Sequence, residues 1–224
     1  MSSISIFFTF FFYFSVLIFI TGLSYKIVQY WNTPAPLKIP IAPAPLTKSG
    51  VFLRLAKEVF LFATLFKSSK WTWLFGWSFH LALVLLFFRH LVYFWPGEIP
   101  LILLKTEPLK YAAYPLIFGL LGLLGRRIFV DRVRYISAPS DYLMLLLIFL
   151  IGASGMVMTF ANNHPNMLLV KNFAEGLITF NWSELPSEVI FLAHIAPVFF
   201  LIAIFPISKL LHGPGIFFSP TLNQ

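Results

Sequence analysis

The hydrophobic residues of the chain gather into five long runs that hold few or no charged side chains. These runs cover residues 4–24, 71–95, 109–125, 142–160 and 188–207. A helix of about 20 such residues crosses the roughly 30 Å hydrocarbon layer of a bilayer. The pattern predicts an all-α integral membrane protein, with one domain over 1–224 and five transmembrane helices.

The longest polar stretch, 25–70, separates the first two runs. It contains the proline-rich segment NTPAPLKIPIAPAPLTKSG, which favours an extended chain. The following VFLRLAKEVFLFATLF mixes apolar and charged positions, as in an amphipathic helix lying on a membrane surface. Such a helix would serve either as a docking platform for a soluble partner or as an interfacial anchor.

The basic residues indicate how the five helices are oriented. The outer segments hold three lysines and five acidic residues. Twelve of the sixteen Lys and Arg residues fall in 25–70, 126–141 and the C-terminal tail. Loops rich in Lys and Arg stay in the cytoplasm. We therefore expect a multi-pass protein of the cell membrane, with its N-terminus outside and its C-terminus in the cytoplasm.

The composition agrees with this class and excludes others. Hydrophobic residues make up 59% of the chain and charged residues only 11%. The net charge of +8 follows the membrane orientation, so we do not expect nucleic acid as a partner. Cysteine is absent, which excludes disulfides, thiol catalysis, covalent haem attachment and iron–sulfur clusters bound by this chain.

Histidines within the apolar runs are the candidate chemistry. His80 and His90 lie ten residues apart in the second run. On a helix this spacing separates them by about 15 Å and points them some 80° apart. One histidine for each of two stacked haems fits that geometry, and two core histidines bonded to neighbouring helices are the alternative.

The expected orientation suggests partners for both histidines. The second and fifth helices run in opposite directions, so His194 is expected at about the depth of His80. We predict that these two residues are the axial ligands of an inner haem b. On the outer side His164 is the candidate partner of His90 for a second haem, whereas His212 is expected in the inner tail, outside the membrane.

Three charged residues near the outer side are further candidates. Arg89 could pair with a haem propionate, or it could extend to the lipid headgroups. Lys110 and Glu107 lie where a quinol head could bind and lose protons, or they are solvated loop charges.

These residues resemble a known family, that of the membrane cytochrome b shared by the gamma subunit of respiratory nitrate reductase and heterodisulfide-reductase-like complexes. The similarity rests on the His80–His90 spacing, on RRIFVDRVR at 126–134 followed by Asp141, and on FPISKLLH at 205–212. It implies the inner His80–His194 pair and a quinol-site lysine at Lys110. It also implies a histidine at the start of the fifth helix as the partner of His90, where this chain has EGLITFNWSELPSE.

A closer resemblance is to the membrane cytochrome of the dissimilatory sulfite reductase-associated complex. It rests on the proline-rich segment, on KWTWLFGW and on the ending HGPGIFFSPT. This resemblance implies electron transfer between menaquinone and a cytoplasmic iron–sulfur subunit related to heterodisulfide reductase, in sulfite or sulfur metabolism. Further membrane and periplasmic redox subunits would complete the complex.

The sequence thus predicts a haem-binding bundle that acts as the electron-transfer subunit of a quinol-dependent oxidoreductase. A nitrate reductase gamma subunit and a cofactor-free membrane anchor are the alternatives. A transporter with a histidine relay is disfavoured, because Asp and Glu are absent from the cores of the five runs.

Overall fold

The computed structural model describes residues 1–33, 45, 47–95, 106–161 and 164–218, and every regular element in them is helical. Residues 34–44, 46 and 96–105, the last of which is Lys105, lie outside the described residues. Residues 162–163 and 219–224, which include the final SPT of HGPGIFFSPT, also lie outside them. In the described part, five helices are long and apolar enough to cross a membrane. The prediction of an all-α membrane bundle is confirmed to this extent.

The five long helices form the body of the molecule. Their bounds are α1 (Ser3–Asn32), α4 (Lys70–Phe94), α6 (Ala113–Phe129), α8 (Pro139–Phe160) and α10 (Val189–Ile204). Helix α6 is preceded by the 3₁₀ helix η1 (Glu107–Ala112), and α10 is followed by η2 (Phe205–Ile207). The first helix runs eight residues further than the apolar run that predicted it, because Tyr25–Asn32 continues the helix with a mixture of polar and apolar side chains.

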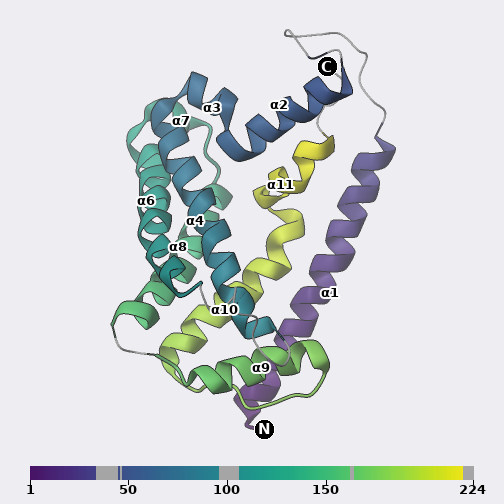
Figure 1. Ribbon diagram of the computed structural model, residues 1–224, viewed down its shortest axis with the longest axis vertical. Helices are drawn as coiled ribbons and strands as arrows, with labels where there is room; N and C mark the ends of the chain where they lie inside the picture. Colours follow the sequence, from purple (N-terminus) through teal and green to yellow (C-terminus); the bar gives the residue numbers. More distant parts are fainter. Residues whose placement is uncertain (34–44, 46, 96–105, 162–163, 219–224) are drawn as a thin grey trace.

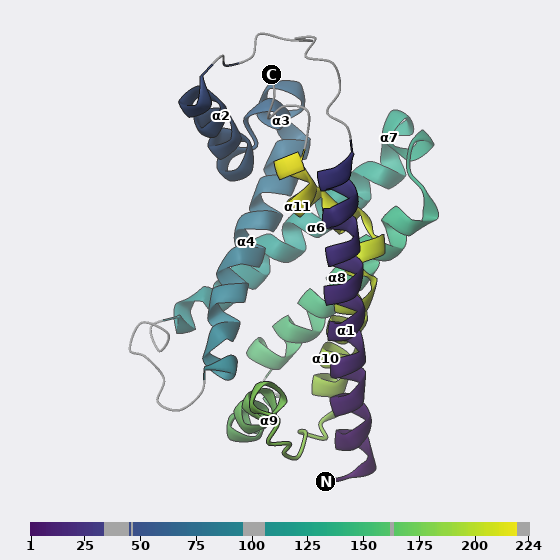
Figure 2. The same cartoon turned by 90° about the vertical axis from the view of Figure 1, so that its right-hand side faces the viewer.

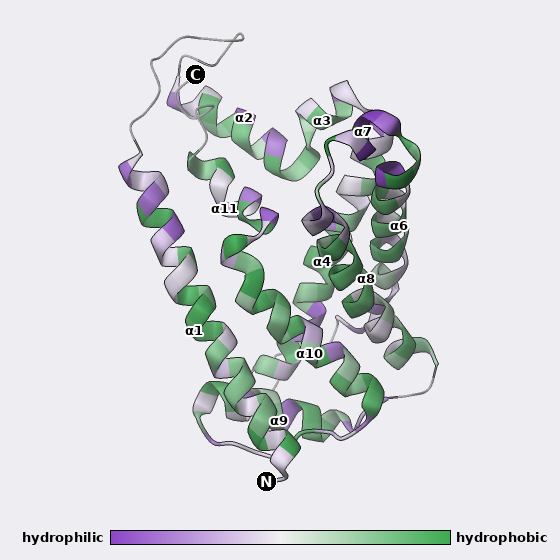
Figure 3. Ribbon diagram, turned by 180° about the vertical axis from the view of Figure 1, so that it is seen from behind, coloured by the Kyte–Doolittle hydropathy of each residue, from purple (hydrophilic) through white to green (hydrophobic). Residues whose placement is uncertain are grey.

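Short helices gather at the two ends of the bundle (Figures 1 and 2). Helices α2 (Lys48–Leu61), α3 (Ala63–Ser68) and α7 (Asp131–Tyr135) lie at one end, and α9 (Met167–Thr179) crosses the other, next to the N-terminus. Helix α2 is the amphipathic helix expected after Ser49. Hydrophilic residues concentrate at the end with α2 and α7, whereas the middle of the bundle is apolar (Figure 3).

The chain after α10 folds back onto the bundle. It forms η2, η3 (Lys209–Leu211), α11 (His212–Gly215) and η4 (Ile216–Phe218). Pro206 is fully buried, and the β-carbon of an alanine in place of Gly22 on α1 would lie only 2.7 Å from the Pro206 side chain. The close approach of α1 therefore holds the turn at Pro206 against the bundle.

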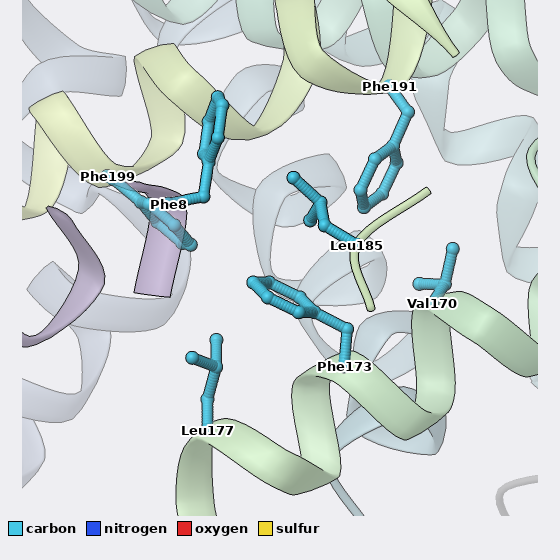
Figure 4. Packing of buried hydrophobic residues seen from close by; sticks show 7 residues of the cluster. All are labelled: Phe8, Val170, Phe173, Leu177, Leu185, Phe191 and Phe199. Carbon is cyan, nitrogen blue, oxygen red and sulfur yellow. The ribbon is translucent and has the colours of Figure 1, made fainter. Parts of the chain in front are cut away.

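Two hydrophobic clusters hold the helices together. The first joins α1, α9 and α10 with the segment before α10 (Figure 4), through Phe8, Val170, Phe173, Leu177, Leu185, Phe191 and Phe199. The second joins α4, α6 and α8, through Phe79, Ala82, Ala112, Leu116, Leu120 and Ile148.

Glycines bring α6 unusually close to α4. An added β-carbon at Gly119 would lie 2.6 Å from the backbone oxygen of Phe75, and one at Gly122 would overlap the Phe75 ring. Small residues that allow backbones to approach are a common means of packing membrane helices, since lipid provides no hydrophobic drive for association. Helix α4, which carries His80 and His90, is thereby fixed against α6.

Candidate functional site: two histidine pairs

His90, near the end of α4, and His194, near the start of α10, lie next to each other. Their ring centres lie 6.3 Å apart, and the ring planes differ by 13°. Tyr93, one turn along α4, also contacts the His90 ring, with ring centres 6.0 Å apart. The two histidines come from helices far apart in sequence, so tertiary packing rather than local spacing makes this pair.

His80 on α4 forms a second pair with His212, the first residue of α11. Their ring centres lie 5.9 Å apart, and the ring planes are nearly perpendicular, at 87°. Phe79 and Phe62 also contact the His80 ring, with ring centres at 4.7 Å and 5.0 Å. The second pair therefore lies at the end of α4 nearer α2 and α3.

All four imidazoles are held through the same ring nitrogen. Each Nδ1 lies within hydrogen-bonding distance of a backbone carbonyl: Gly76 at 2.7 Å from His80, Leu86 at 2.6 Å from His90, Ile151 at 3.0 Å from His194 and Lys209 at 2.7 Å from His212. A carbonyl oxygen accepts and cannot donate, so Nδ1 carries the proton in each neutral ring. The Nε2 atom is left with its lone pair, which is the arrangement that metal-binding histidines use.

The spacing of the rings agrees with a metal between them. With bonds of about 2 Å from the metal to each nitrogen, and about 1.2 Å from that nitrogen to its ring centre, two opposed imidazoles have centres about 6.4 Å apart. The observed separations are 6.3 Å and 5.9 Å. The separation of the ring centres in each pair is therefore close to the spacing that a shared metal atom would require.

The donor set distinguishes between kinds of metal site. Within the described residues, no group of three or more His, Asp or Glu side chains could hold a metal ion. A pair of imidazoles fills only two opposite positions of a metal and leaves the positions between them to other ligands. A porphyrin supplies those four ligands in one plane, so haem iron is the metal that these pairs fit.

A charged cluster positions His212. The carboxylate of Asp141, at the start of α8, is 2% exposed and contacts Lys209 Nζ at 2.5 Å and Arg127 Nη1 at 3.5 Å. It also accepts a hydrogen bond from the Ala138 backbone N–H at 2.9 Å. Because Lys209 belongs to η3 and its carbonyl accepts from His212, the ion pair ties the segment that carries His212 to α8.

Arg89 provides a buried donor beside the first pair. Its Nε atom is buried, and no described residue is its hydrogen-bond partner. A buried N–H without a partner is costly, so its presence beside His90 in the sequence suggests an acceptor outside the described residues. The carboxylate of a haem propionate would be such an acceptor.

Lys110 and Glu107 lie together on η1, which packs against α4. Lys110 Nζ donates to Glu107 Oε1 at 2.6 Å, and the Lys110 ammonium lies 5.4 Å from the centre of the Tyr111 ring. The Glu107 side chain is 61% exposed. The two charges thus form one exposed pair and not two separate loop residues.

The pairing of the histidines differs from the predicted one. His194 contacts His90 and not His80, and His80 contacts His212, which the sequence reading left outside the membrane. His164 is exposed, between α8 and α9, and takes no part in the ring contacts of His90. His90 lies four residues before the end of α4 and His194 five residues after the start of α10, which places these two level in antiparallel helices. His212 reaches His80 because the chain turns back after α10.

Comparison with known proteins identifies the family of the chain. The family described as nitrate reductase gamma subunit matches residues 50–222, a range that includes all four paired histidines. The chain belongs to this family.

Two curated relatives give a more specific comparison than the family does. The chain is 33% identical to the Hdr-like menaquinol oxidoreductase cytochrome b-like subunit of Archaeoglobus fulgidus, over 95% of this chain and 77% of the relative. It is 31% identical to the protein of the same name from Archaeoglobus profundus, over 92% of this chain and 75% of the relative. The resemblance to a heterodisulfide-reductase-like membrane cytochrome is confirmed.

Proposed function

We propose that the chain is a membrane cytochrome b subunit that carries electrons between menaquinol and a cytoplasmic partner, through two haems. His90 and His194 would hold one haem, and His80 and His212 the other. The observation that carries this proposal is the two imidazole pairs, each with Nδ1 bonded to a carbonyl and with ring spacings that fit a shared metal. Bound haem supplies the reversible one-electron redox chemistry.

The residues of the chain would keep each haem in place and set its surroundings. The four Nδ1 hydrogen bonds fix the rotation of the imidazole rings and raise the basicity of the Nε2 atoms. Arg89 would donate its buried N–H to a propionate near the His90–His194 pair. The Asp141–Lys209 ion pair would hold the His212 segment in reach of His80.

The basic residues support an orientation in which α2, α3 and α7 face the cytoplasm. The electron acceptor or donor on that side would be an iron–sulfur subunit related to heterodisulfide reductase, as the family resemblance implies; the relatives' names describe a subunit of an Hdr-like menaquinol oxidoreductase. The His80–His212 pair, which lies at this end, would exchange electrons with it. Further redox subunits of the membrane and periplasm, and a role in sulfite or sulfur metabolism, belong to the same proposal.

The quinol site would lie at the opposite end, near η1. Oxidation of a menaquinol releases two electrons and two protons, so a site there needs groups that accept hydrogen bonds and protons. The carboxylate of Glu107 can accept a proton, and Lys110 can hold the oxygen of the quinone head. Protons released at this face would leave on the outer side of the membrane.

Haem content of single histidine variants tests the proposal. We expect pyridine haemochrome analysis of the purified chain to give two b haems per molecule. His90→Ala and His194→Ala should each lose one haem, and the double variant should lose no more than either single variant. His80→Ala and His212→Ala should behave in the same way for the other haem.

His164→Ala is the matched control and should keep both haems. The sequence-based pairing makes a different prediction, namely that His212→Ala keeps both haems and that His80 and His194 share one. A wild-type chain without b-type difference bands would instead favour the cofactor-free anchor, and the proposed function would be abandoned.

A further inference from the structure

The turn between α2 and α3 places a phenylalanine in a backbone conformation that suits glycine. Phe62 has φ 49° and ψ 47°, in the left-handed region. Among the described residues, Phe62 and Phe180 are the non-glycine residues with positive φ. Since a β-carbon makes this region unfavourable, a glycine would form the turn more easily, and the phenylalanine needs another explanation.

Helix α4 holds this turn from the other side. Trp73 Nε1 donates to the Leu61 carbonyl at 2.8 Å, and Trp77 Nε1 donates to the Phe60 carbonyl at 3.0 Å. These carbonyls belong to the last turn of α2 and have no partner within that helix. The two tryptophans therefore satisfy the end of α2 and fix it against α4.

Glu58 holds the turn from within. Its carbonyl accepts from the Phe62 N–H at 3.2 Å. Its carboxylate accepts from the Thr64 N–H at 3.1 Å and from the Thr64 hydroxyl at 2.6 Å, at the start of α3. The position of the Phe62 side chain is thus set by bonds on both sides of the turn.

The Phe62 ring lies edge to face on the imidazole of His80. The ring centres are 5.0 Å apart, and the planes meet at 79°. Phe79 contacts the same imidazole from α4 itself, at 4.7 Å. Phe62 is therefore the residue through which the α2–α3 segment reaches the His80–His212 pair.

We propose that Phe62 is a positioning residue that covers His80 on the side of α2 and keeps water from that side of the His80 imidazole, which raises the redox potential of the haem that His80 would hold. The inference rests on the proposed function. An iron porphyrin with two neutral imidazoles carries one more positive charge when oxidised than when reduced. Water stabilises that charge, so an apolar cover favours the reduced form, and its loss should favour the oxidised form.

Redox titration of the purified two-haem protein tests this proposal, with Phe62→Gly as the variant. Glycine relieves the backbone strain and removes the ring. We expect the oxidised-to-reduced ratio of one haem, at a fixed ambient potential, to rise about three- to tenfold, which corresponds to a fall of about 30–60 mV at 59 mV per decade. The affected haem should be the one that is missing in His212→Ala.

Phe180→Gly is the matched control. Phe180 has φ 59° at the end of α9, and its ring stacks on Tyr13 and not on a histidine. The Phe180→Gly variant relieves the same kind of backbone strain and should leave the redox potentials of both haems unchanged. Phe62→Leu, which keeps an apolar side chain, should stay near the wild-type potential even if the glycine variant loses haem.

Three outcomes would overturn the proposal: unchanged potentials in Phe62→Gly, an equal shift in Phe180→Gly, or a leucine variant as low as the glycine variant. These outcomes leave the two haems in place, so they count against Phe62 and not against the proposed function. Absence of haem from the wild-type protein would count against the proposed function instead.

Discussion

Gly119 offers a direct test of how closely α4 and α6 pack. The β-carbon of an alanine at this position would lie 2.6 Å from the Phe75 carbonyl oxygen and 2.8 Å from the Phe79 β-carbon. Ordinary contacts between such atoms begin at about 3.5 Å. The missing distance is therefore close to 1 Å, and no side-chain rotation can provide it, because both obstructing atoms are fixed to the backbone of α4.

The size of the effect follows from this geometry. Forcing extra atoms into a packed interior costs about 1–3 kcal/mol when the neighbours cannot rotate away. For a chain of 150–250 residues, 1 kcal/mol shifts the melting temperature by about 2–4 °C, so Gly119→Ala should lower it by roughly 2–12 °C. Since α4 carries both His80 and His90, the separation of the helices should also lower the haem content under the proposed function.

Gly125→Ala on the same helix is the control. The nearest atom to its added β-carbon is Phe129 Cδ2 at 3.9 Å, which is an ordinary contact. This variant should melt within about 2 °C of the wild type, because an uncrowded glycine-to-alanine change costs little or is slightly favourable in a helix. The assay is circular dichroism during heating of both variants in one detergent. Equal melting temperatures for the two variants would refute the close α4–α6 contact.

Two further predictions concern the charged groups. Asp141→Asn removes the charge that holds Lys209 while keeping the size of the side chain. Because this ion pair ties the His212 segment to α8, we expect selective loss of the haem that His212→Ala also loses. Difference spectra of the variant measure this loss. Glu184, outside the membrane spans, accepts hydrogen bonds from Ser2 and Ser5, which lower its pKa below the ordinary 4.5. Its contribution to stability should be complete above pH 4.5 and lost as the pH falls through the lowered pKa, so Glu184→Gln should flatten the acid side of a melting-temperature profile; an unchanged profile would contradict this assignment.

The sequence was sufficient for the elements that depend on local pattern. Runs of apolar residues predicted the five long helices, and the alternation of apolar and charged positions after Ser49 predicted α2. The ends of the helices were less predictable, since Tyr25–Asn32 continues α1 beyond its uninterrupted apolar run. Length and hydropathy decide whether a span forms, whereas caps and contacts decide where it ends.

The histidines of the candidate site could be picked out from the sequence, but the rings that meet in the structure are not the ones that were expected to meet. Imidazoles in apolar helices pointed to haem because few other roles fit them. His212 was excluded as a pair member because it follows the last span, yet it lies in the FPISKLLH segment that suggested the family. The useful signal was Lys209 in that segment together with the acidic Asp141 at the start of α8, which can tie the tail to the bundle.

The turn after α10 is what makes two pairs possible on one helix. His80 and His90 are separated by about 15 Å along α4, at 1.5 Å per residue. His194 and His212 are eighteen residues apart, and an unbroken helix would separate them by about 27 Å. Two straight helices could therefore match one pair but not both. The turn through η2 and η3, at Pro206 and Ser208, ends the helix and brings the His212 ring to within 5.9 Å of the His80 ring. The level of His194 along α10 matches that of His90 on α4, whereas the break after α10 is what brings His212 to His80.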